Sequence, residues 1–429
     1  MREMKDSGVE WIGEIPCDWK LERSQWHLEE VNISNNPVQT NNVLSLTNKL
    51  GVVPYEEKGN QGNKSKENVY EYKLAYPNTI VANSMNILIG SVGLCDYFGC
   101  VSPVYYVFRA KKYNNIKFLN YVFQTVGFQR ELRKYANGIL EIRLRVSASD
   151  ILKRFIPFPS ENEQQRIAEF LDRACGEIDG LKADIQAQID TLEQYKRSVI
   201  TEAVTHGLNP SAPMKDSGIP WGDKIPQNWE EARVKYVAIC LKKGNGITKE
   251  DIVENGDTPC VRYGEIYTKY DLSFSECTTR TNKEIISSKQ YFKQGDILFA
   301  GTGELIEEIG KNIVYLGAGE CLAGGDIIIL KHKQNAKYLN YALNAECMQA
   351  QKSCNKAKLK VVHISAFEIG NIRIAIPPLD EQQKIADYLD NKCAEIEQII
   401  ADKKSQIETL DSYKKSLIYE YVTGKKEVV

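Results

Sequence analysis

The chain contains the same long segment twice, and this repeat limits what it can fold into. At an offset of 218, residues 163–205 are identical to residues 381–423 at 23 of 43 positions, beginning with EQQRIAEFLD and EQQKIADYLD. A second block opens each half: MKDSGVEWIGEIPCDW at 4–19 returns as MKDSGIPWGDKIPQNW at 214–229, with 9 of 16 positions identical. Because the period far exceeds the roughly 20–50 residues of solenoid repeats, we interpret the chain as a tandem duplication of one large unit.

Each half has the same order: an opening block, a variable body and a long helix. We expect four segments, with bounds at residues 1–160, 161–206, 207–378 and 379–429. The bodies have diverged until little aligns beyond the echo of KFLNY in KYLNY, whereas the helices have stayed alike. This contrast suggests that both helices meet the same kind of partner while the two bodies do different jobs.

Both long helices carry an apolar stripe whose spacing alternates between three and four residues, which is typical of a coiled coil. The stripe of the first helix comprises Ile167, Leu171, Ala174, Ile178, Leu181, Ile185, Leu192, Tyr195 and Val199. The stripe of the second comprises Ile385, Leu389, Ile396, Ile399, Leu410, Tyr413 and Leu417. In the first stripe Gln188 fills one seam position, next to Ile189. The second stripe is interrupted at Lys392, Lys403 and Gln406, with Ile400 and Ile407 next to the gaps.

A helix of this length cannot bury such a stripe alone, so the stripe predicts packing against something else. One interpretation packs each helix along its own body. The other, which we favour, pairs the two helices antiparallel about a pseudo-twofold axis. We include the glutamines of the repeated EQQ motif, Gln164, Gln165, Gln382 and Gln383, in this coil or subunit interface.

Both bodies contain short β-like runs separated by turn residues, followed by a helical stretch and a final strand. Examples are NTIVANSMNILIGSVG in the first body and GDILFAGTG in the second. The predicted fold class is α+β. We expect two globular domains related by pseudo-twofold symmetry and separated by two long antiparallel coiled-coil helices.

Composition excludes several classes of protein. No apolar run reaches the roughly 18 residues of a membrane span, and the start has no apolar signal segment. The eleven cysteines are scattered singly, which argues against a disulfide framework and favours a reducing cytoplasm. The four histidines have no metal-ligand spacing, so we expect no metal site.

Net charge is only −2, but basic residues concentrate late in each body. Residues 109–154 hold 11 Lys and Arg against 3 acids, and residues 331–373 hold 8 against 2. Alternate cations on a strand share one face, which suits a phosphate backbone as well as plain solvation. The candidate phosphate contacts are Arg143, Arg145, Lys358 and Lys360. The candidate base-reading residues are Asn83, Ser84, Arg262 and Tyr263.

Several sequence features imitate catalytic or cofactor motifs. The segment IVYLGAGECLAGG (313–325) resembles a dinucleotide-binding loop, but another strand follows where a helix is needed. There is no GxxxxGK[ST], no D/N-PP-Y/F tetrapeptide and no nucleophile elbow. The sequence therefore predicts no catalytic residue in this chain. Trp19 and Trp229, in the opening blocks, are interpreted as packing anchors.

Two diverged bodies, each followed by P-x-x-x-EQQ-x-IA-x-(F/Y)-LD and a long helix, resemble the specificity subunit of Type I restriction-modification enzymes. The resemblance covers essentially the whole chain. It implies that the bodies are target recognition domains, each reading one half of a split, asymmetric site in double-stranded DNA. It also implies that the helices dock two DNA adenine methyltransferase subunits, with restriction subunits joining in the full complex.

The same resemblance implies a non-catalytic, cytoplasmic protein of bacteria or archaea. S-adenosylmethionine, ATP and Mg would then bind only to partner subunits, and this chain would hold no cofactor. An alternative from another class is a duplicated adaptor that pairs partner proteins without reading DNA. A third interpretation, that the chain is itself a methyltransferase, is disfavoured because the sequence lacks methyltransferase motifs such as the D/N-PP-Y/F tetrapeptide.

Overall fold

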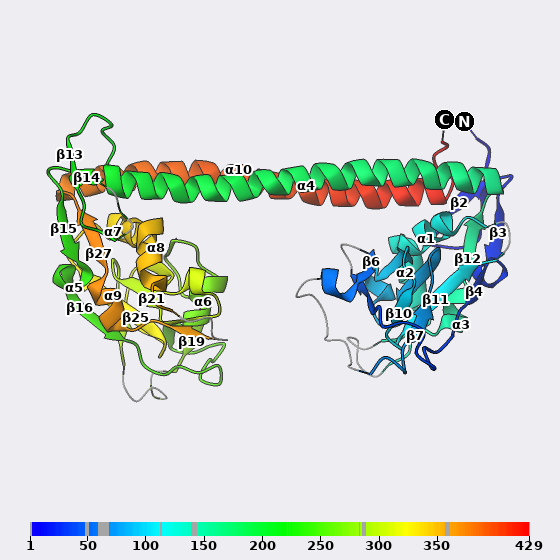
Figure 1. Cartoon of the computed structure of the whole chain (residues 1–429), viewed down its shortest axis with the longest axis horizontal. Helices are drawn as coiled ribbons and strands as arrows, with labels where there is room; N and C mark the ends of the chain where they lie inside the picture. The colour runs from blue at the N-terminus through cyan, green and yellow to red at the C-terminus, as the bar shows by residue number, and fades with distance from the viewer. Residues whose placement is uncertain are drawn as a thin grey trace. The chain divides into compact units, whose positions relative to one another are not determined.

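The structure is a computed structural model that describes residues 2–47, 51–58, 68–111, 114–138, 144–220, 222, 224–282, 284, 289–356 and 361–428. The chain forms two compact units, residues 1–185 with 404–429 and residues 186–403. We call residues 2–160 the first head and residues 207–378 the second head. Each unit contains one head together with part of both long helices, α4 (Glu161–His206) and α10 (Leu379–Val422). The colour gradient of Figure 1 follows the chain through both.

The first head is built on a four-stranded antiparallel sheet in the order β4-β11-β8-β9. These strands are β4 (Leu28–Glu30), β11 (Tyr105–Ala110), β8 (Thr79–Asn83) and β9 (Val92–Cys95). Two-stranded pairs surround it: β1 (Met4–Asp6) with β2 (Glu14–Pro16), β3 (Lys20–Arg23) with β12 (Phe155–Phe158), β5 (Leu44–Thr47) with β6 (Gly51–Pro54), and β7 (Lys73–Ala75) with β10 (Gly99–Val101). The helices are α1 (Ile116–Gln124), α2 (Val126–Arg133) and α3 (Ala148–Leu152), with short 3-10 turns η1 (Ser24–Trp26), η2 (Tyr55–Lys58) and η3 (Ile87–Ile89).

The second head has a five-stranded sheet and a four-stranded sheet. The first is β16 (Ala238–Lys243), β25 (Ile327–His332), β21 (Ile297–Ala300), β23 (Asn312–Tyr315) and β18 (Ser273–Phe274), in that order. The second is β19 (Thr279–Thr281), β17 (Thr258–Val261), β24 (Cys321–Ala323) and β20 (Tyr291–Phe292). The pairs are β13 (Met214–Asp216) with β14 (Lys224–Pro226), β15 (Glu230–Arg233) with β27 (Arg373–Ile376), and β22 (Thr302–Gly303) with β26 (Val362–His363). The helices are α5 (Val234–Val237), α6 (Tyr263–Thr268), α7 (Ala336–Asn344), α8 (Glu346–Ser353) and α9 (Ala366–Asn371), with η5 (Ile306–Glu308).

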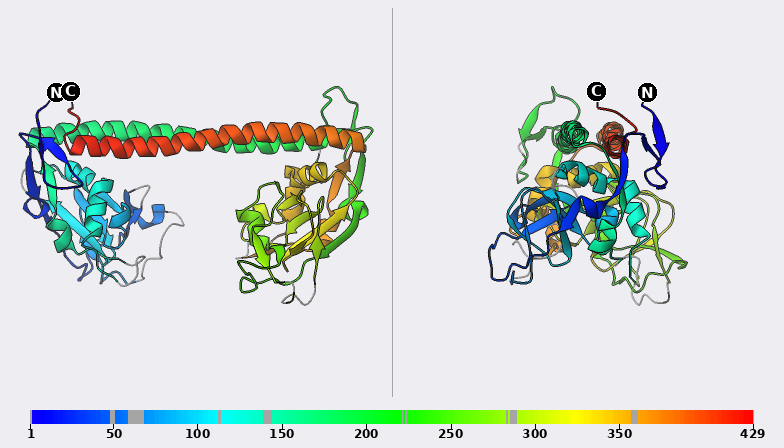
Figure 2. Two further views of the ribbon diagram at one scale, coloured as in Figure 1. Left: turned by 180° about the vertical axis from the view of Figure 1, so that it is seen from behind. Right: turned by 90° about the vertical axis from the view of Figure 1, so that its right-hand side faces the viewer.

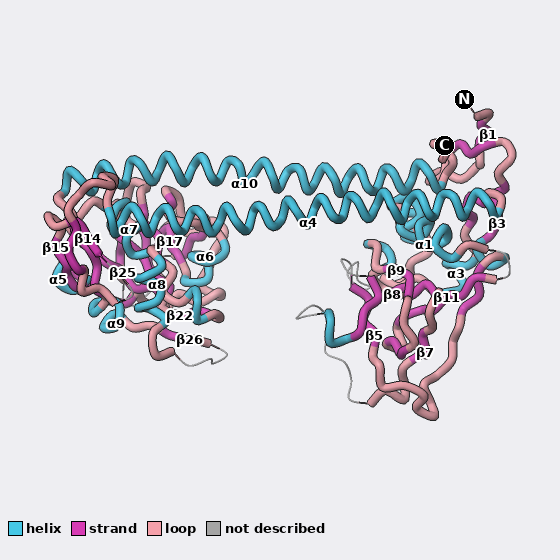
Figure 3. The backbone as a smooth tube through the Cα atoms, turned by 45° about the horizontal axis from the view of Figure 1, so that its top comes forward, coloured by secondary structure: helices cyan, strands magenta, loops and turns pink. Residues whose placement is uncertain are grey.

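The two heads share a framework that their sequences no longer show. In the first head β8 pairs with β9, with Ala82 opposite Val92. In the second head β21 pairs with β23 in the same register, with Phe299 opposite Asn312. In both, an asparagine caps the helix that follows the sheet, and Figure 3 shows α7 between the strands of the second head and the long helices. The predicted α+β fold class is confirmed.

The two long helices run side by side and antiparallel within each unit (Figures 1 and 2). In the first unit Asp179 pairs with Lys414 at 2.6 Å, and Lys182 pairs with Asp411. In the second unit Lys196 pairs with Glu397 at 2.6 Å, while the Lys403 ammonium donates to the Gln188 amide oxygen at 2.5 Å. In each unit the residue number of the α10 partner falls as the residue number along α4 rises, which confirms the predicted antiparallel pairing.

The seam between the helices differs in phase from the predicted stripe. Ile178 is buried and Ile185 is half-buried, but the positions that alternate with them lie one residue later than predicted, at buried Cys175 and Ile189 and at Lys182, which pairs with α10. Leu181 and Tyr195, predicted in the seam, are 53% and 54% exposed, so that part of the prediction is wrong. The same shift leaves Ile399 and Tyr413 outside the seam of α10, at 44% and 53% exposed. Leu192 and Leu410 are half-buried, and Ile396 is buried.

The ends of the long helices belong to the cores of the heads. Ile167 and Leu171 of α4, together with Leu417 of α10, are buried in the core of the first head. Ile385 and Leu389 of α10 join the core of the second head, together with Val199 of α4. Both interpretations of the apolar stripe therefore apply, each to a different stretch of helix. In the described part of the chain, no helix has the length and apolar character needed to cross a membrane.

Glycines allow the helix ends to approach the heads closely. The chain leaves α10 through Gly424, where φ is +72° and an added Cβ would lie 2.4 Å from Cδ of Pro16. The Lys425 ammonium then donates to the carbonyl of Ile12 at 2.6 Å. At the end of α4, Gly207 has φ +75° and packs against the indole of Trp229. Each head is thus held by the start of one long helix and the end of the other.

Candidate functional site

The repeated EQQ motif attaches each long helix to its own head. In the first unit the buried Gln164 amide oxygen accepts the backbone N–H of Asn115 at 3.0 Å, and its NH2 group donates to the Pro159 carbonyl at 3.0 Å. The amide oxygen of Gln165 accepts from the Asn115 side chain. Since Asn115 caps α1, the pair of glutamines fixes that helix to the start of α4.

The second unit repeats this arrangement. Gln382 accepts the backbone N–H of Asn335 at 3.0 Å and donates to the Pro377 carbonyl at 2.8 Å. Gln383 accepts from the side chain of Asn335, the cap of α7, at 2.7 Å. The four glutamines therefore lie at the helix–head junctions, and the coil or subunit interface to which the sequence analysis assigned them stays a prediction. The motif recurs because both junctions are built from the same parts.

Glutamates and tryptophans complete the outer side of each junction. In the first unit Glu163 accepts from the indole N–H of buried Trp19 at 3.0 Å and pairs with Arg2 at 2.5 Å. In the second, Glu381 accepts from Asn228 at 3.2 Å, beside the fully buried Trp229. Both tryptophans are packing anchors, as their place in the repeated opening blocks predicts.

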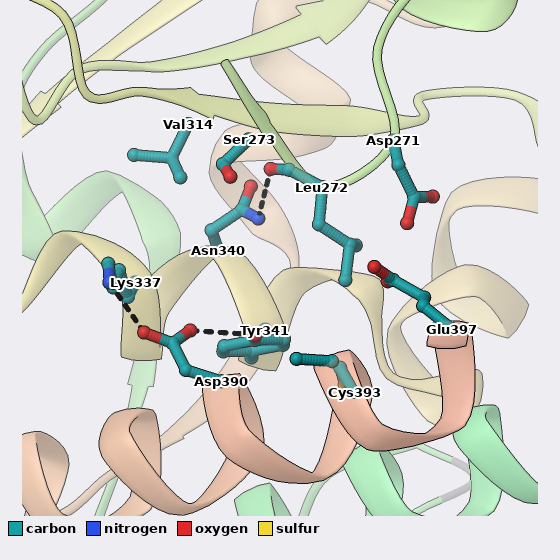
Figure 4. A pocket seen from close by; sticks show the side chains of 11 residues that line it. Asp271, Leu272, Ser273, Val314, Lys337, Asn340, Tyr341, Asp390, Cys393 and Glu397 are labelled. Carbon is teal, nitrogen blue, oxygen red and sulfur yellow. Dashed lines mark hydrogen bonds and ion pairs between the residues drawn. The ribbon is translucent and has the colours of Figure 1, made fainter. Parts of the chain in front are cut away.

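The LD of the repeated segment binds the KxLNY echo of each body. Asp172 pairs with Lys117 at 2.6 Å and accepts from the Tyr121 hydroxyl at 2.8 Å. Asp390 does the same with Lys337 at 2.5 Å and Tyr341 at 2.9 Å (Figure 4). Burial, followed by the contact with the aspartate, raises the pKa of Tyr121 well above its ordinary value, so the phenol remains a donor at neutral pH. The repeated LD of the long helix and the repeated KxLNY segment of the body therefore contact each other in both units.

In the second unit a cavity of about 310 Å³ lies next to this contact (Figure 4). Its polar lining includes Asp271, Asn340 and Glu397. Lys196 of α4 closes the cluster by donating to Asp271 at 2.8 Å and to Glu397 at 2.6 Å. Because these carboxylates are already paired with lysines, the cluster acts as a brace between head, α10 and α4. The equivalent contact in the first unit is Asp179 with Lys414.

The structure places the predicted DNA-contacting residues of the first head in two settings. Asn83 and Ser84 end β8 and are only 7% and 3% exposed. The Asn83 side chain accepts the backbone N–H of Met85 at 3.0 Å, and the Ser84 carbonyl accepts that of Val146 at 3.1 Å. In this structure both residues shape the loop, and neither presents a free side chain at the surface. Arg145 is exposed and exchanges two backbone hydrogen bonds with Asn137.

The other predicted phosphate contacts, Arg143, Lys358 and Lys360, lie outside the described residues. In the second head, Arg262 and Tyr263 lie where β17 passes into α6, and Tyr263 is 39% exposed. The backbone N–H of Arg262 donates to buried Glu265 at 2.9 Å. Both residues line a second cavity, together with Lys249 and two glycine turns that the sequence analysis did not select. One of these turns belongs to the glycine-rich segment interpreted above as an imitation of a cofactor loop.

Comparison with known proteins identifies the family. The model of the Type I restriction modification DNA specificity domain matches residues 28–191 and 226–409, one match in each half. The chain belongs to this family.

The chain is 25% identical over 288 residues to the type I restriction enzyme MjaVIII specificity subunit of Methanocaldococcus jannaschii, covering 64% of this chain and 62% of that protein. It is 26% identical over 320 residues to the MjaIX specificity subunit of the same organism, covering 73% of this chain and 69% of that protein. Thus the match to the first of these relatives spans about three fifths of its length. A solved chain described as showing complex assembly and conformational transition of the type I R-M system shares the fold, with a TM-score of 0.70, 14% identity, and coverage of 96% of this chain and 99% of that chain.

Proposed function

We propose that this chain is the DNA-recognition subunit of a Type I restriction-modification complex and that each head reads one half of a split DNA site. The observation that carries the proposal is one framework used twice with different surfaces. The registers of β8 with β9 and of β21 with β23 are equivalent, and the two junctions use the same residue types. Outside this framework the two heads have little sequence in common. Two different DNA-reading surfaces on the same framework suit an asymmetric site.

The contacts that fix each head to the long helices suit the reading of a split site. Equivalent protein contacts on one face of DNA recur about every helical turn, roughly 34–36 Å apart. Reading two half-sites together therefore requires that each head keep a fixed orientation relative to the long helices that carry it. The brace formed by Gln164 and Asp172, and its counterpart at Gln382 and Asp390, would provide that rigidity.

The exposed apolar residues of the long helices are our candidates for docking two methyltransferase subunits. In the first unit Leu181 and Tyr413 each precede a seam lysine, and the Lys182–Asp411 and Asp179–Lys414 pairs place them at the same level. In the second unit Tyr195 precedes Lys196 and Ile399 precedes the buried Ile400, beside the Lys196–Glu397 pair. Residues next to the seam on facing antiparallel helices lie on one side of the coil. Each unit would thus offer one equivalent apolar patch, and so bind one methyltransferase.

We further propose that this chain is not itself a catalyst. Its charged clusters at the junctions are paired internally, and the sequence carries none of the motifs that bind S-adenosylmethionine or ATP. Those cofactors and Mg would bind to the methyltransferase and restriction subunits. Among the described residues no group of His, Cys, Asp and Glu side chains has the arrangement of a metal site.

The deciding experiment is a methylome. The methyltransferase encoded with this chain would be expressed in a methylation-free host with and without the chain, and modified adenines would be mapped by sequencing. We expect methylation of a split asymmetric site only when both proteins are present. If the two proteins co-purify but no methylated sequence depends on this chain, an adaptor that pairs partners without reading DNA becomes the better description.

A further inference from the structure

The second head contains a cavity of about 560 Å³ beside the start of α6, the helix labelled in Figure 1. It lies between two glycine turns, at residues 244–246 and 324–325. Its charged lining residues are Lys249, Arg262, Glu265, Lys269 and Asp326. Neither the helix–head junction nor the helix pairing uses the residues that line this cavity.

The two turns touch backbone to backbone, which only glycine permits. A Cβ on Gly244 would lie 2.2 Å from the carbonyl oxygen of Gly324. A Cβ on Gly325 would lie 3.0 Å from Cα of Gly246. Within the part of the chain that the structure describes, the backbone N–H groups of Gly246 and Gly325 donate to no other group. Free N–H groups at a concave turn are a common binding site for anions.

The charges of the cavity favour an anion as well. Glu265 is already paired with Lys269 at 2.7 Å, and Asp326 with Lys243 at 3.0 Å. By contrast, the Arg262 guanidinium has a buried Nε without a hydrogen-bond partner. A buried donor without an acceptor is unfavourable, so the site is incomplete as it stands. Lys249, exposed at the rim, forms no ion pair with any other described residue.

We propose that this cavity holds a phosphate group of the DNA backbone. The inference rests on the proposed function and adds to it the chemical class of group bound here. A concave site receives a protruding group, and phosphates protrude from duplex DNA whereas base edges lie inside the grooves. A guanidinium donates two parallel hydrogen bonds to phosphate oxygens, and the glycine N–H groups supply further donors. Arg262 is then a positioning residue and does not read a base.

The first head lacks these residues at the equivalent places. Parallel pairing of Val43 with Cys100 there corresponds to pairing of Cys260 with Leu322 in the second head. By this correspondence Ser45 stands in place of Arg262, and Ser102 and Pro103 stand in place of Gly324 and Gly325. The phosphate site therefore belongs to the second head alone, and the two heads hold DNA by different contacts.

The test compares Arg262→Ala with wild type in the full chain, co-expressed with its methyltransferase, by titration of duplex DNA at several salt concentrations. We expect about 10- to 100-fold weaker binding, the loss of one charged contact. The slope of log K against log salt should fall by about 1. The methylated sequence should stay the same in the methylome. Arg262→Lys keeps the charge and should restore the slope, with binding between the two.

The control is Lys224→Ala, which removes one positive charge from an exposed position on β14 of the same head. It should change neither affinity nor slope. Equal binding and slope for Arg262→Ala and wild type would overturn this proposal alone. A methylated sequence altered at one half-site would also overturn it, because Arg262 would then read a base. A wild-type complex that does not bind DNA would overturn the proposed function itself.

Discussion

At the residue scale, the two heads differ at one buried lysine. Lys352 of α8 is 1% exposed and donates to the Asn312 amide oxygen at 2.8 Å and to the Leu343 carbonyl at 2.7 Å. None of its partners is a carboxylate. At the equivalent positions the first head has Leu132 and Val92, both buried. A polar pair in one core thus replaces an apolar pair in the other.

This pair predicts a pH dependence of stability in the second head. Burial lowers the pKa of Lys352 to about 7, whereas in the unfolded chain it is near 10.4. Between these values the unfolded state binds the extra proton, so the free energy of unfolding should rise with pH, by about 1 kcal/mol per unit. Chemical denaturation from pH 7 to 9 would measure this slope. Lys352→Leu with Asn312→Val should remove it, and a slope retained in that double variant would disprove the assignment.

A second prediction concerns the glutamines of the junction. Gln382→Ala removes a fully buried side chain and leaves the Asn335 N–H and the Pro377 carbonyl without partners. Each buried unpaired group costs about 1–3 kcal/mol, so we expect about 2–4 kcal/mol of destabilisation. Gln383→Ala, its exposed neighbour, is the matched control and should cost less than about 1 kcal/mol. Equal losses measured by thermal unfolding would contradict the role given to the buried glutamine.

At the scale of elements, different stretches of α4 and of α10 pack against different partners. Their first and last turns complete the cores of the heads, and the turns between them pair with each other. The residues one position before the seam, Leu181, Tyr195, Ile399 and Tyr413, stay outside both packings. Apolar side chains exposed at four equivalent positions contribute nothing to these cores, which is the reason for assigning them to a partner.

Replacing Leu181 and Tyr413 with glutamine should therefore weaken methyltransferase binding without lowering stability. Because the first unit alone is altered, the complex should contain one methyltransferase per chain where the wild type has two. The mass of the purified complex, measured by native mass spectrometry, distinguishes these cases. Tyr195→Gln with Ile399→Gln makes the same change in the second unit and should behave alike. Two methyltransferases retained in both double variants would rule out these patches as docking sites.

At the scale of the whole molecule, the proposed division of labour predicts that heads can be exchanged. Residues 20–155 could be replaced by the body of another member of the family, keeping Lys117, Asn115 and Tyr121, which contact α4. Only one half of the methylated site should change, since the second head and both junctions are untouched. Methylome sequencing of the hybrid would show this directly. A change in both halves would mean that the heads do not read independently.

The sequence alone determined the duplication, the α+β class of the bodies and the two long helices, and it favoured antiparallel pairing of those helices over packing of each along its own body. These follow from periodicity and from identity between the halves, which are local properties of the chain. The EQQ and KxLNY repeats were also visible. The contacts that these repeats make were not visible, because the backbone N–H of Asn115 donates to Gln164 and the Tyr121 hydroxyl donates to Asp172, and each pair is far apart in sequence.

Only the tertiary structure decided the phase of the helix seam and the nature of the candidate site. Apolar residues occur at both Leu181 and Cys175, and both phases satisfy a spacing of three and four. The partner helix selects one phase by pairing Lys182 with Asp411, which leaves Leu181 in solvent. Likewise, Arg262 became significant through a cavity formed by glycines from two distant turns. The periodicity of the sequence indicates which residues can be buried. The surface that packs against them determines which of these residues are buried in the fold.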